Sequence, residues 1–282
     1  MTRELTLVTG GTGTTGRRVV QRLEARGERV RVASRHSACP LDWEQPDTWG
    51  PALAGVTGVY LAYAPDLAVP GAADTLAAFT RRAATSGVQR VVLLSGRGEP
   101  GAHRAERAVA AVADAAGIDL TVLRCSWFVQ NVTEGQFAPA VRAGELALPV
   151  GDVAEPFLDA EDVADAAVVA LLADGHAGRT YELTGPRALG FAEVVQEIAA
   201  VQRRPVGFRS VPMAEFRGAL AAEGVPGDVR DLLTHLFTEV LDGRNASLTD
   251  GVQRALGREP RDFSAYVRET AATGVWSAFS KG

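Results

Sequence analysis

The chain has 282 residues, which suits one large α/β domain or one domain with a smaller appended lobe. Hydrophobic residues make up 46% of the sequence and charged residues 22%, as in an ordinary globular protein. The net charge of −5 argues against direct nucleic-acid binding, because proteins of that class usually carry a clustered basic patch.

Neither a targeting segment nor a membrane span is expected. The first apolar run, residues 5–8, is too short for a signal sequence, and the apolar window 163–173 is too short to cross a bilayer. The two cysteines, Cys39 and Cys125, lack metal-ligand spacing and are predicted to be free thiols. These features predict a cytoplasmic protein, a monomer or homodimer, that acts on a small molecule and not on nucleic acid or membranes.

Short apolar runs alternate with helical patterns over the first half of the chain, and the helical patterns end at glycines such as Gly27 and Gly117. The predicted strands cover residues 5–8, 30–33, 59–62, 90–94 and 120–123, and the predicted helices between them include residues 49–53, 72–86 and 105–116. Repeated β-α-β units predict a Rossmann-type, doubly wound parallel sheet that binds its ligand at the carboxyl ends of the strands.

After about residue 150 the pattern becomes mostly helical. Strands are predicted at 180–183 and 207–211, and helices at 162–172, 191–201, 213–222, 229–241 and 263–270. We therefore expect a dinucleotide-binding domain over residues 1–150. The remainder, 151–282, is expected to form a smaller lobe that covers the substrate and is partly interwoven with the sheet.

A glycine-rich turn, TGGTGTTG at 9–16, follows the first strand and opens a helix. Gly10 permits the sharp turn, Gly13 lets the backbone approach a pyrophosphate, and Gly16 allows close packing of helix and strand. Amides at the helix start favour a phosphate anion, and the hydroxyls of Thr12, Thr14 and Thr15 add donors. This context predicts a dinucleotide site, and the alternative is a tight turn without a ligand.

The end of the second strand decides between NAD and NADP. NAD-binding proteins usually place a carboxylate there, whereas this chain has Ser34 and Arg35. A guanidinium can hold a 2′-phosphate through charge-assisted hydrogen bonds, so NADP(H) is predicted; the alternative is a solvated surface arginine. Asp42 is a candidate contact to the adenine edge or an ordinary turn residue.

Seven segments occur in order over nearly the whole chain: TGGTGTTG (9–16), YLAYAPDL (60–67), VVLLSGRGE (91–99), TVLRCSWFVQN (121–131), PFLDAEDVADAA (156–167), GRTYELTGP (178–186) and ALGREPRDFSAY (255–266). In this combination the chain resembles the NmrA-like group of atypical short-chain dehydrogenases/reductases. Within that group it is most similar to the bacterial quinone and triphenylmethane reductases and to the ergot-type iminium reductases. The resemblance implies an NAD(P)-binding oxidoreductase.

The resemblance also implies roles for three further segments. Ala62, Tyr63 and Ala64 would line the adenosine ribose and pyrophosphate, and Ser95 and Gly96 would lie beside the nicotinamide ribose. The nicotinamide and substrate end would be bordered by Ser126, Trp127, Phe128, Val129, Gln130 and Asn131. Trp127 and Phe128 can stack on a flat substrate or belong to the core.

The Tyr-x-x-x-Lys pair of ordinary short-chain dehydrogenases is absent from the helix after the serine strand, which begins GAHRAER (101–107). His103 is a candidate general acid, and Glu106 or Arg107 a candidate anchor of the nicotinamide ribose; each can also be a solvated helix residue. An iminium ion needs only hydride, and quinones and cationic dyes are strong hydride acceptors. The missing pair therefore favours a conjugated acceptor.

Two function classes remain open. The first is an NADPH-dependent reductase of a quinone, an iminium compound or an activated carbonyl. The second is a redox sensor of the NmrA type, which binds NADP without turning it over. An epimerase-like enzyme is a weaker third reading. The carboxylates at 159, 161, 162 and 165 suggest a helix start, and no metal site is predicted.

Overall fold

The computed structural model describes residues 4–276, and the chain divides into two compact units. The first unit comprises Met1–Cys125, Ala160–Leu183 and Thr249–Glu259, and the second comprises Ser126–Asp159, Thr184–Leu248 and Pro260–Gly282. The chain therefore passes between the units several times.

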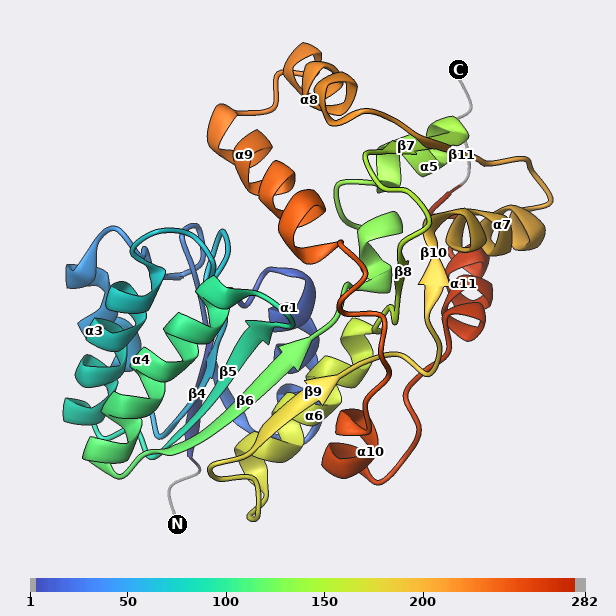
Figure 1. Cartoon of the computed structure of the whole chain (residues 1–282). Helices are drawn as coiled ribbons and strands as arrows, with labels where there is room; N and C mark the ends of the chain where they lie inside the picture. The colour runs from blue at the N-terminus through green and yellow to red at the C-terminus, as the bar shows by residue number, and fades with distance from the viewer. Residues whose placement is uncertain (1–3, 277–282) are drawn as a thin grey trace. The chain divides into compact units, whose positions relative to one another are not determined.

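The first unit is built on a parallel seven-stranded sheet with the order β3-β2-β1-β4-β5-β6-β9, as the Rossmann prediction required (Figure 1). Its strands are β1 (Leu5–Thr9), β2 (Arg29–Ser34), β3 (Cys39–Pro40), β4 (Gly58–Leu61), β5 (Arg90–Gly96), β6 (Asp119–Cys125) and β9 (Thr180–Leu183). The strand order reverses beside β1, where β4 pairs with its other edge, and this reversal creates the crevice in which such sheets bind ligands.

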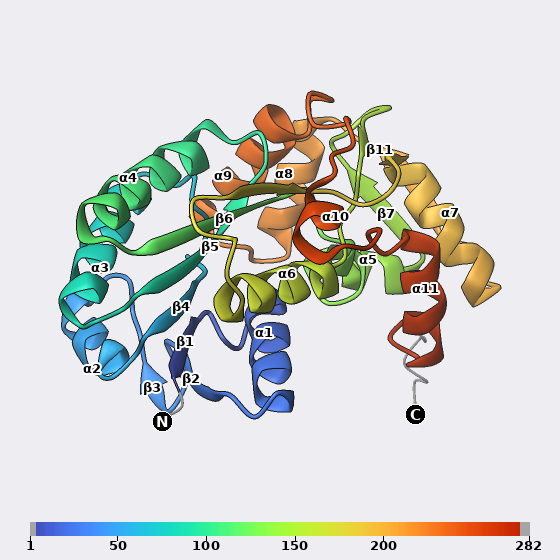
Figure 2. The same ribbon diagram turned by 90° about the horizontal axis from the view of Figure 1, so that it is seen from below.

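Helices cover both faces of this sheet. Helices α3 (Ala72–Thr85) and α4 (Pro100–Ala116) lie on one face, and α1 (Thr14–Ala25) and α6 (Ala160–Leu172) lie on the other (Figure 2). The short helices α2 (Trp49–Leu53) and α10 (Gly251–Leu256) and the 3-10 turn Pro46–Thr48 complete the unit. Helix α4 begins five residues before the predicted start, because Pro100 has the backbone angle of a first helical turn.

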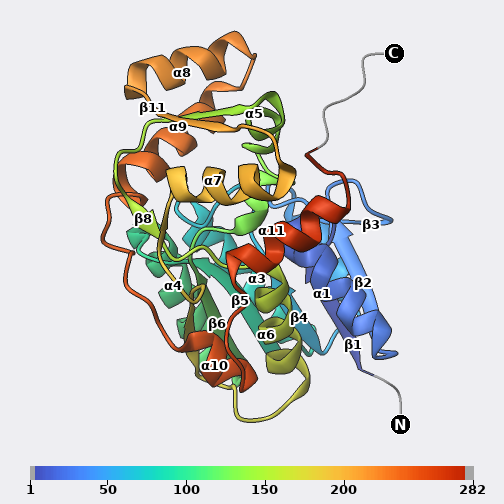
Figure 3. The same cartoon turned by 90° about the vertical axis from the view of Figure 1, so that its right-hand side faces the viewer.

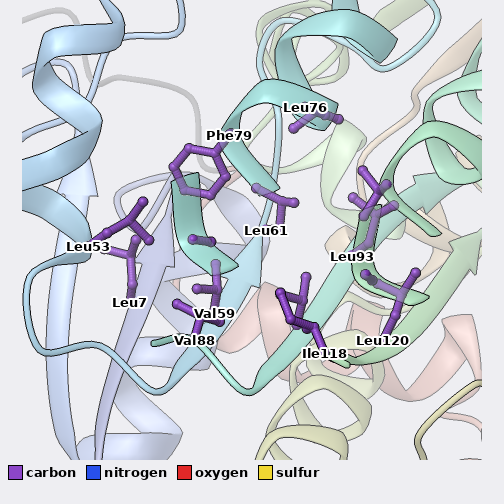
Figure 4. Close-up of a cluster of buried hydrophobic side chains, with 14 of the residues drawn as sticks. Leu7, Leu53, Val59, Leu61, Leu76, Phe79, Val88, Leu93, Ile118 and Leu120 are labelled. Atoms are coloured by element: carbon purple, nitrogen blue, oxygen red, sulfur yellow. The ribbon is translucent and has the colours of Figure 1, made fainter. Parts of the chain in front are cut away.

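The core under α3 and α4 is apolar. Strand residues such as Leu7, Leu61 and Leu93 meet Leu76 and Phe79 of α3 (Figure 4). Each of these five side chains is at most 1% exposed. Burying a side chain of this size stabilises the fold by about 1.5–3 kcal/mol, so this cluster holds the strand ends in fixed positions.

On the other face of the sheet, helices α1 and α6 are linked to each other by ion pairs. Arg18 contacts Glu161 at 2.6 Å, and Arg22 contacts Glu161 and Asp165, each at 2.5 Å. Arg258, which follows α10, pairs with Asp165 at 2.6 Å and with Asp162 at 2.7 Å. The acidic residues of α6 thus serve helix packing, and no group of His, Cys, Asp or Glu able to hold a metal occurs within residues 4–276.

The second unit is mixed, with short strands and a helical majority. Its strands pair as β7 (Glu145–Leu148) with β11 (Gly207–Ser210) and as β8 (Ala154–Glu155) with β10 (Leu189–Gly190). Its helices are α5 (Ala138–Ala143), α7 (Phe191–Gln202), α8 (Met213–Ala222), α9 (Gly227–His235) and α11 (Phe263–Ala272), with a 3-10 turn at Val129–Val132 and a π-helical turn at Leu236–Val240. Helix α7 packs against α11 (Figure 3). No helix among the described residues is both long and apolar enough to cross a bilayer.

Candidate functional site

The glycine turn between β1 and α1 has the geometry that its spacing predicts. Gly10 has a left-handed backbone with φ +58°, which side-chain-bearing residues rarely adopt. A Cβ at Gly16 would lie 2.2 Å from the carbonyl oxygen of Gly10, so only glycine fits where the helix crosses the turn. The N–H of Gly13 donates to that carbonyl at 2.8 Å, and α1 starts at the next residue.

The start of α1 is open to an anion. No side chain in the described chain caps this terminus, so its first amides keep their hydrogen-bonding capacity. Thr12 and Gly13 are exposed, and Thr14 is half-buried. The helix dipole adds a partial positive charge at the same place. The glycine turn and the start of α1, residues 10–16, form a cradle that fits a pyrophosphate, whose negative oxygens would accept hydrogen bonds from these amides.

Thr9 joins the turn to the end of β4. Its hydroxyl accepts from the N–H of Ala62 at 2.8 Å and lies 3.0 Å from the carbonyl oxygen of that residue. A Cβ at Gly10 would be 3.6 Å from the Cβ of Ala62. The structure therefore brings the segment Ala62–Ala64 beside the glycine turn, and Tyr63 packs on Trp43 with ring centroids 5.1 Å apart.

The end of β2 also lies beside the turn, because the N–H of Gly11 donates to the carbonyl of Ala33 at 3.2 Å. Arg35 is the second residue past that contact; it is exposed and forms no ion pair or hydrogen bond within residues 4–276. The carboxylate of Asp42 accepts from the N–H of Glu44 and from Nε2 of Gln45, both at 3.0 Å. Asp42 thus closes a local turn in this structure.

The hydroxyl of Ser95, at the end of β5, donates a hydrogen bond to the carboxylate of Glu106 in α4 at 2.5 Å. Glu106 also pairs with Arg124 of β6 at 2.6 Å, and this contact raises the pKa of Arg124. Since Glu106 is only 5% exposed, the expectation of a solvated helix residue is wrong for it. Its partners explain the burial, because a buried carboxylate needs a charge and donors. Arg124 further contacts Glu182 of β9 at 3.4 Å.

His103 lies in the first turns of α4, half-buried. Its Nε2 is shielded from solvent and has no hydrogen-bond partner within the described residues. Arg107 is exposed. Neither side chain is held by the network of Ser95, Glu106 and Arg124.

The segment Ser126–Asn131 opens the second unit, and several of its side chains have internal partners. Ser126 donates to the carbonyl of Pro156 at 2.6 Å, and Nε2 of Gln130 donates to Asp159 at 2.7 Å. Trp127 stacks on Phe137 with centroids 6.2 Å apart and also meets Phe191 and Phe237. Phe128 is half-buried and makes no ring contact with any described aromatic residue.

Comparison with known proteins finds sequence similarity to oxidoreductases. The family model "NAD dependent epimerase/dehydratase family" matches residues 6–98, which span the glycine turn and strands β1 to β5 of the sheet. The uncharacterized oxidoreductase YesF of Bacillus subtilis is 33% identical over 288 residues, covering 97% of this chain and 96% of YesF.

Two further similarities concern proteins with a stated activity. The NAD(P)H azoreductase of Xenophilus azovorans is 29% identical over 94% of this chain and 98% of its own length. The crystal structure of Citrobacter triphenylmethane reductase complexed with NADP(H) superposes with a TM-score of 0.77 at 20% identity, over 94% of this chain and 99% of the reductase. The structural likeness establishes the shared fold.

Proposed function

Because this chain belongs to the NmrA-like group of atypical short-chain dehydrogenases/reductases, a family of NAD(P)H-dependent oxidoreductases, we propose that it is an NADPH-dependent reductase of small conjugated acceptors. The observation that carries the proposal is the cradle between β1, β2 and β4: an open helix terminus, a glycine turn, and Arg35 in place of a carboxylate. The acceptor is a quinone, an iminium compound or an activated carbonyl.

Different residues of the cradle bind different parts of the cofactor. Gly10, Gly13 and Gly16 hold the pyrophosphate against backbone amides, and Arg35 pairs with the 2′-phosphate. Ala62 and its two successors line the cofactor where β4 ends. NADPH, when bound, supplies the hydride.

The acceptor class follows from what α4 lacks. A simple ketone needs an acid that protonates the developing alkoxide, and the start of α4 offers His103 but no tyrosine-lysine pair. Conjugated acceptors spread the incoming electron pair and depend less on an acid. Dye-reducing relatives are consistent with this class. Phe128, an aromatic side chain without a ring partner in the described structure, is the group we assign to a flat acceptor.

The test is NADPH consumption, followed at 340 nm, with a quinone, a cationic triphenylmethane dye, an azo dye and a cyclic iminium salt. We expect turnover with at least one of these and none with cyclohexanone, which needs acid assistance. Rapid reduction of cyclohexanone, with a bell-shaped pH profile lost in His103→Gln, would contradict the acceptor class. Tight NADPH binding without consumption across the panel would instead favour the redox-sensor function.

Arg35 decides the cofactor preference in this proposal. Arg35→Ser removes a charge-assisted contact worth about 1.5–3 kcal/mol, so the Kd for NADPH is expected to rise about 10–100-fold. NADH has no 2′-phosphate, and its Kd should change less than about twofold. Titration of tryptophan fluorescence measures both constants. Arg81→Ser, on the exposed surface of α3, is the matched control. An equal rise in the Kd values for NADPH and NADH would show that Arg35 does not bind the 2′-phosphate.

A further inference from the structure

Two carboxyl groups meet at the carboxyl ends of β4 and β5. Glu99 is 7% exposed, and its carboxyl group is hydrogen-bonded to the side chain of Asp66 in the loop after β4. The carboxylate of Asp66 also accepts from the N–H of Ala68 at 2.7 Å. Two touching carboxylates cannot both stay ionised without strong repulsion, so the pair holds one proton between them at neutral pH.

The pair lies against the backbone of the predicted cofactor site. A Cβ at Gly96 would lie 2.7 Å from Oε1 of Glu99, so the carboxyl group rests directly on the Cα of Gly96. Gly96 is the residue that the sequence places beside the nicotinamide ribose. Asp66 follows Ala64, the last residue of the segment beside the glycine turn, by two positions. Both members of the pair therefore lie within three residues of positions expected to line the cofactor.

We propose that the Asp66–Glu99 pair couples cofactor binding to proton uptake, so that NADP(H) binds tightly only while one proton is held between the two carboxyl groups. The inference rests on the proposed function, since it takes the glycine turn as an NADP(H) site. The physical reason is charge. The cofactor carries several negative charges, and a second carboxylate charge at a poorly hydrated edge would repel it. Glu99 acts here as a positioning residue of the cofactor site.

The groups around Glu99 allow this proton to be released near neutral pH. Burial, together with the charge and hydrogen bond of Asp66, raises the pKa of Glu99 from 4.5 to about 8. On its own loop, the guanidinium of Arg97 pairs with Glu182 at 3.2 Å. On α4 the nearest titratable side chain in sequence is His103.

Most basic side chains of this protein keep their charge between pH 7 and 9.5. The sequence holds one lysine, Lys281, so nearly all its basic side chains are arginines that stay charged. Burial raises the pKa of the Cys125 thiol, which removes that thiol from the range between pH 7 and 9.5.

Below pH 8 the pair keeps its proton and the cofactor binds; above pH 8 the pair becomes doubly charged and binding must recapture a proton. The Kd for NADPH is therefore expected to rise tenfold per pH unit above pH 8, or about 30-fold between pH 7 and 9.5. The 2′-phosphate ionises near pH 6 and does not interfere in this window.

The experiment measures the NADPH Kd by tryptophan fluorescence from pH 7 to 9.5 in the wild type and in Glu99→Gln. The amide keeps the shape of the protonated acid and cannot titrate, so its Kd should stay constant within about twofold. Glu24→Gln, on the exposed side of α1, is the control and should keep the wild-type slope. A purely structural Glu99 would leave the slope of the variant unchanged, and that result would overturn the proposal.

Calorimetry of the wild type gives a readout that does not depend on any variant. Titrations at pH 8.5 in two buffers of different ionisation enthalpy should show uptake of about 0.8 proton per NADPH bound. Tight binding with no proton uptake would overturn the coupling and leave the proposed reductase intact. Failure to bind NADPH at any pH would overturn both.

Discussion

Gly16→Ala is expected to weaken NADPH binding more than 100-fold, which corresponds to about 2.7 kcal/mol. The added Cβ would lie 2.2 Å from the carbonyl oxygen of Gly10 and 2.8 Å from Cα of Gly11. These neighbours are backbone atoms, so the turn itself must move, and its amides then point away from the pyrophosphate. Overpacking of this kind also destabilises the fold by about 1–3 kcal/mol.

Gly218→Ala is the matched control. Gly218 lies inside α8, has an ordinary helical backbone, and a Cβ there meets nothing within 4 Å. Alanine should stabilise this helix by about 0.5–1 kcal/mol and leave the NADPH Kd unchanged. Thermal unfolding and fluorescence titration of both variants separate loss of binding from loss of folding. Wild-type affinity in a folded Gly16→Ala would show that the turn does not hold the cofactor.

Glu106→Ala should lower the free energy of unfolding by about 2–4 kcal/mol. The substitution leaves the hydroxyl of Ser95 and the guanidinium of Arg124 without their common acceptor. Losing one member of a buried pair costs about 3–5 kcal/mol, and the lower range applies here because Arg124 is partly exposed and keeps Glu182. Urea unfolding followed by circular dichroism measures the change.

Glu145→Ala is the comparison for an exposed pair. Glu145 contacts Arg209 at 3.3 Å, and both side chains are at least half exposed, so its removal should cost less than about 0.5 kcal/mol. If Glu106→Ala were equally mild, the network at the ends of β5 and β6 would not hold these strands together. Either result bears on how firmly Ser95 is positioned beside the proposed cofactor.

Local pattern determined much of the first unit. The alternation of apolar strands and glycine-terminated helices predicted β1, β2, β4, β5 and β6 in order, with bounds within about two residues of those observed. The glycine spacing predicted a turn whose left-handed Gly10 and crowded Gly16 are both present. These features could be predicted from the sequence because each depends on a few adjacent residues. The size of a side chain, or its absence in glycine, determines which backbone conformation those residues adopt.

The strands β3, β7, β8 and β10 were not predicted. The two-residue strands β3, β8 and β10 carry too little periodicity to be recognised, whereas β7 was missed although strands of the same length elsewhere were predicted. The predicted helix 229–241 divides into α9 and a π-helical turn. Such features depend on partners far along the chain, as β8 depends on β10.

The sequence by itself determined the Rossmann class, the family and the glycine turn, since all three are local or collinear patterns. The tertiary structure alone decided which charges meet. Asp66 and Glu99 are 33 positions apart, and Glu106 and Arg124 are 18 apart; parallel pairing of β4, β5 and β6 brings these pairs to one edge of the sheet. The carboxyl group of Glu99 is therefore a buried acid beside Gly96. Burial and proximity set its charge, and neither is encoded in any single segment.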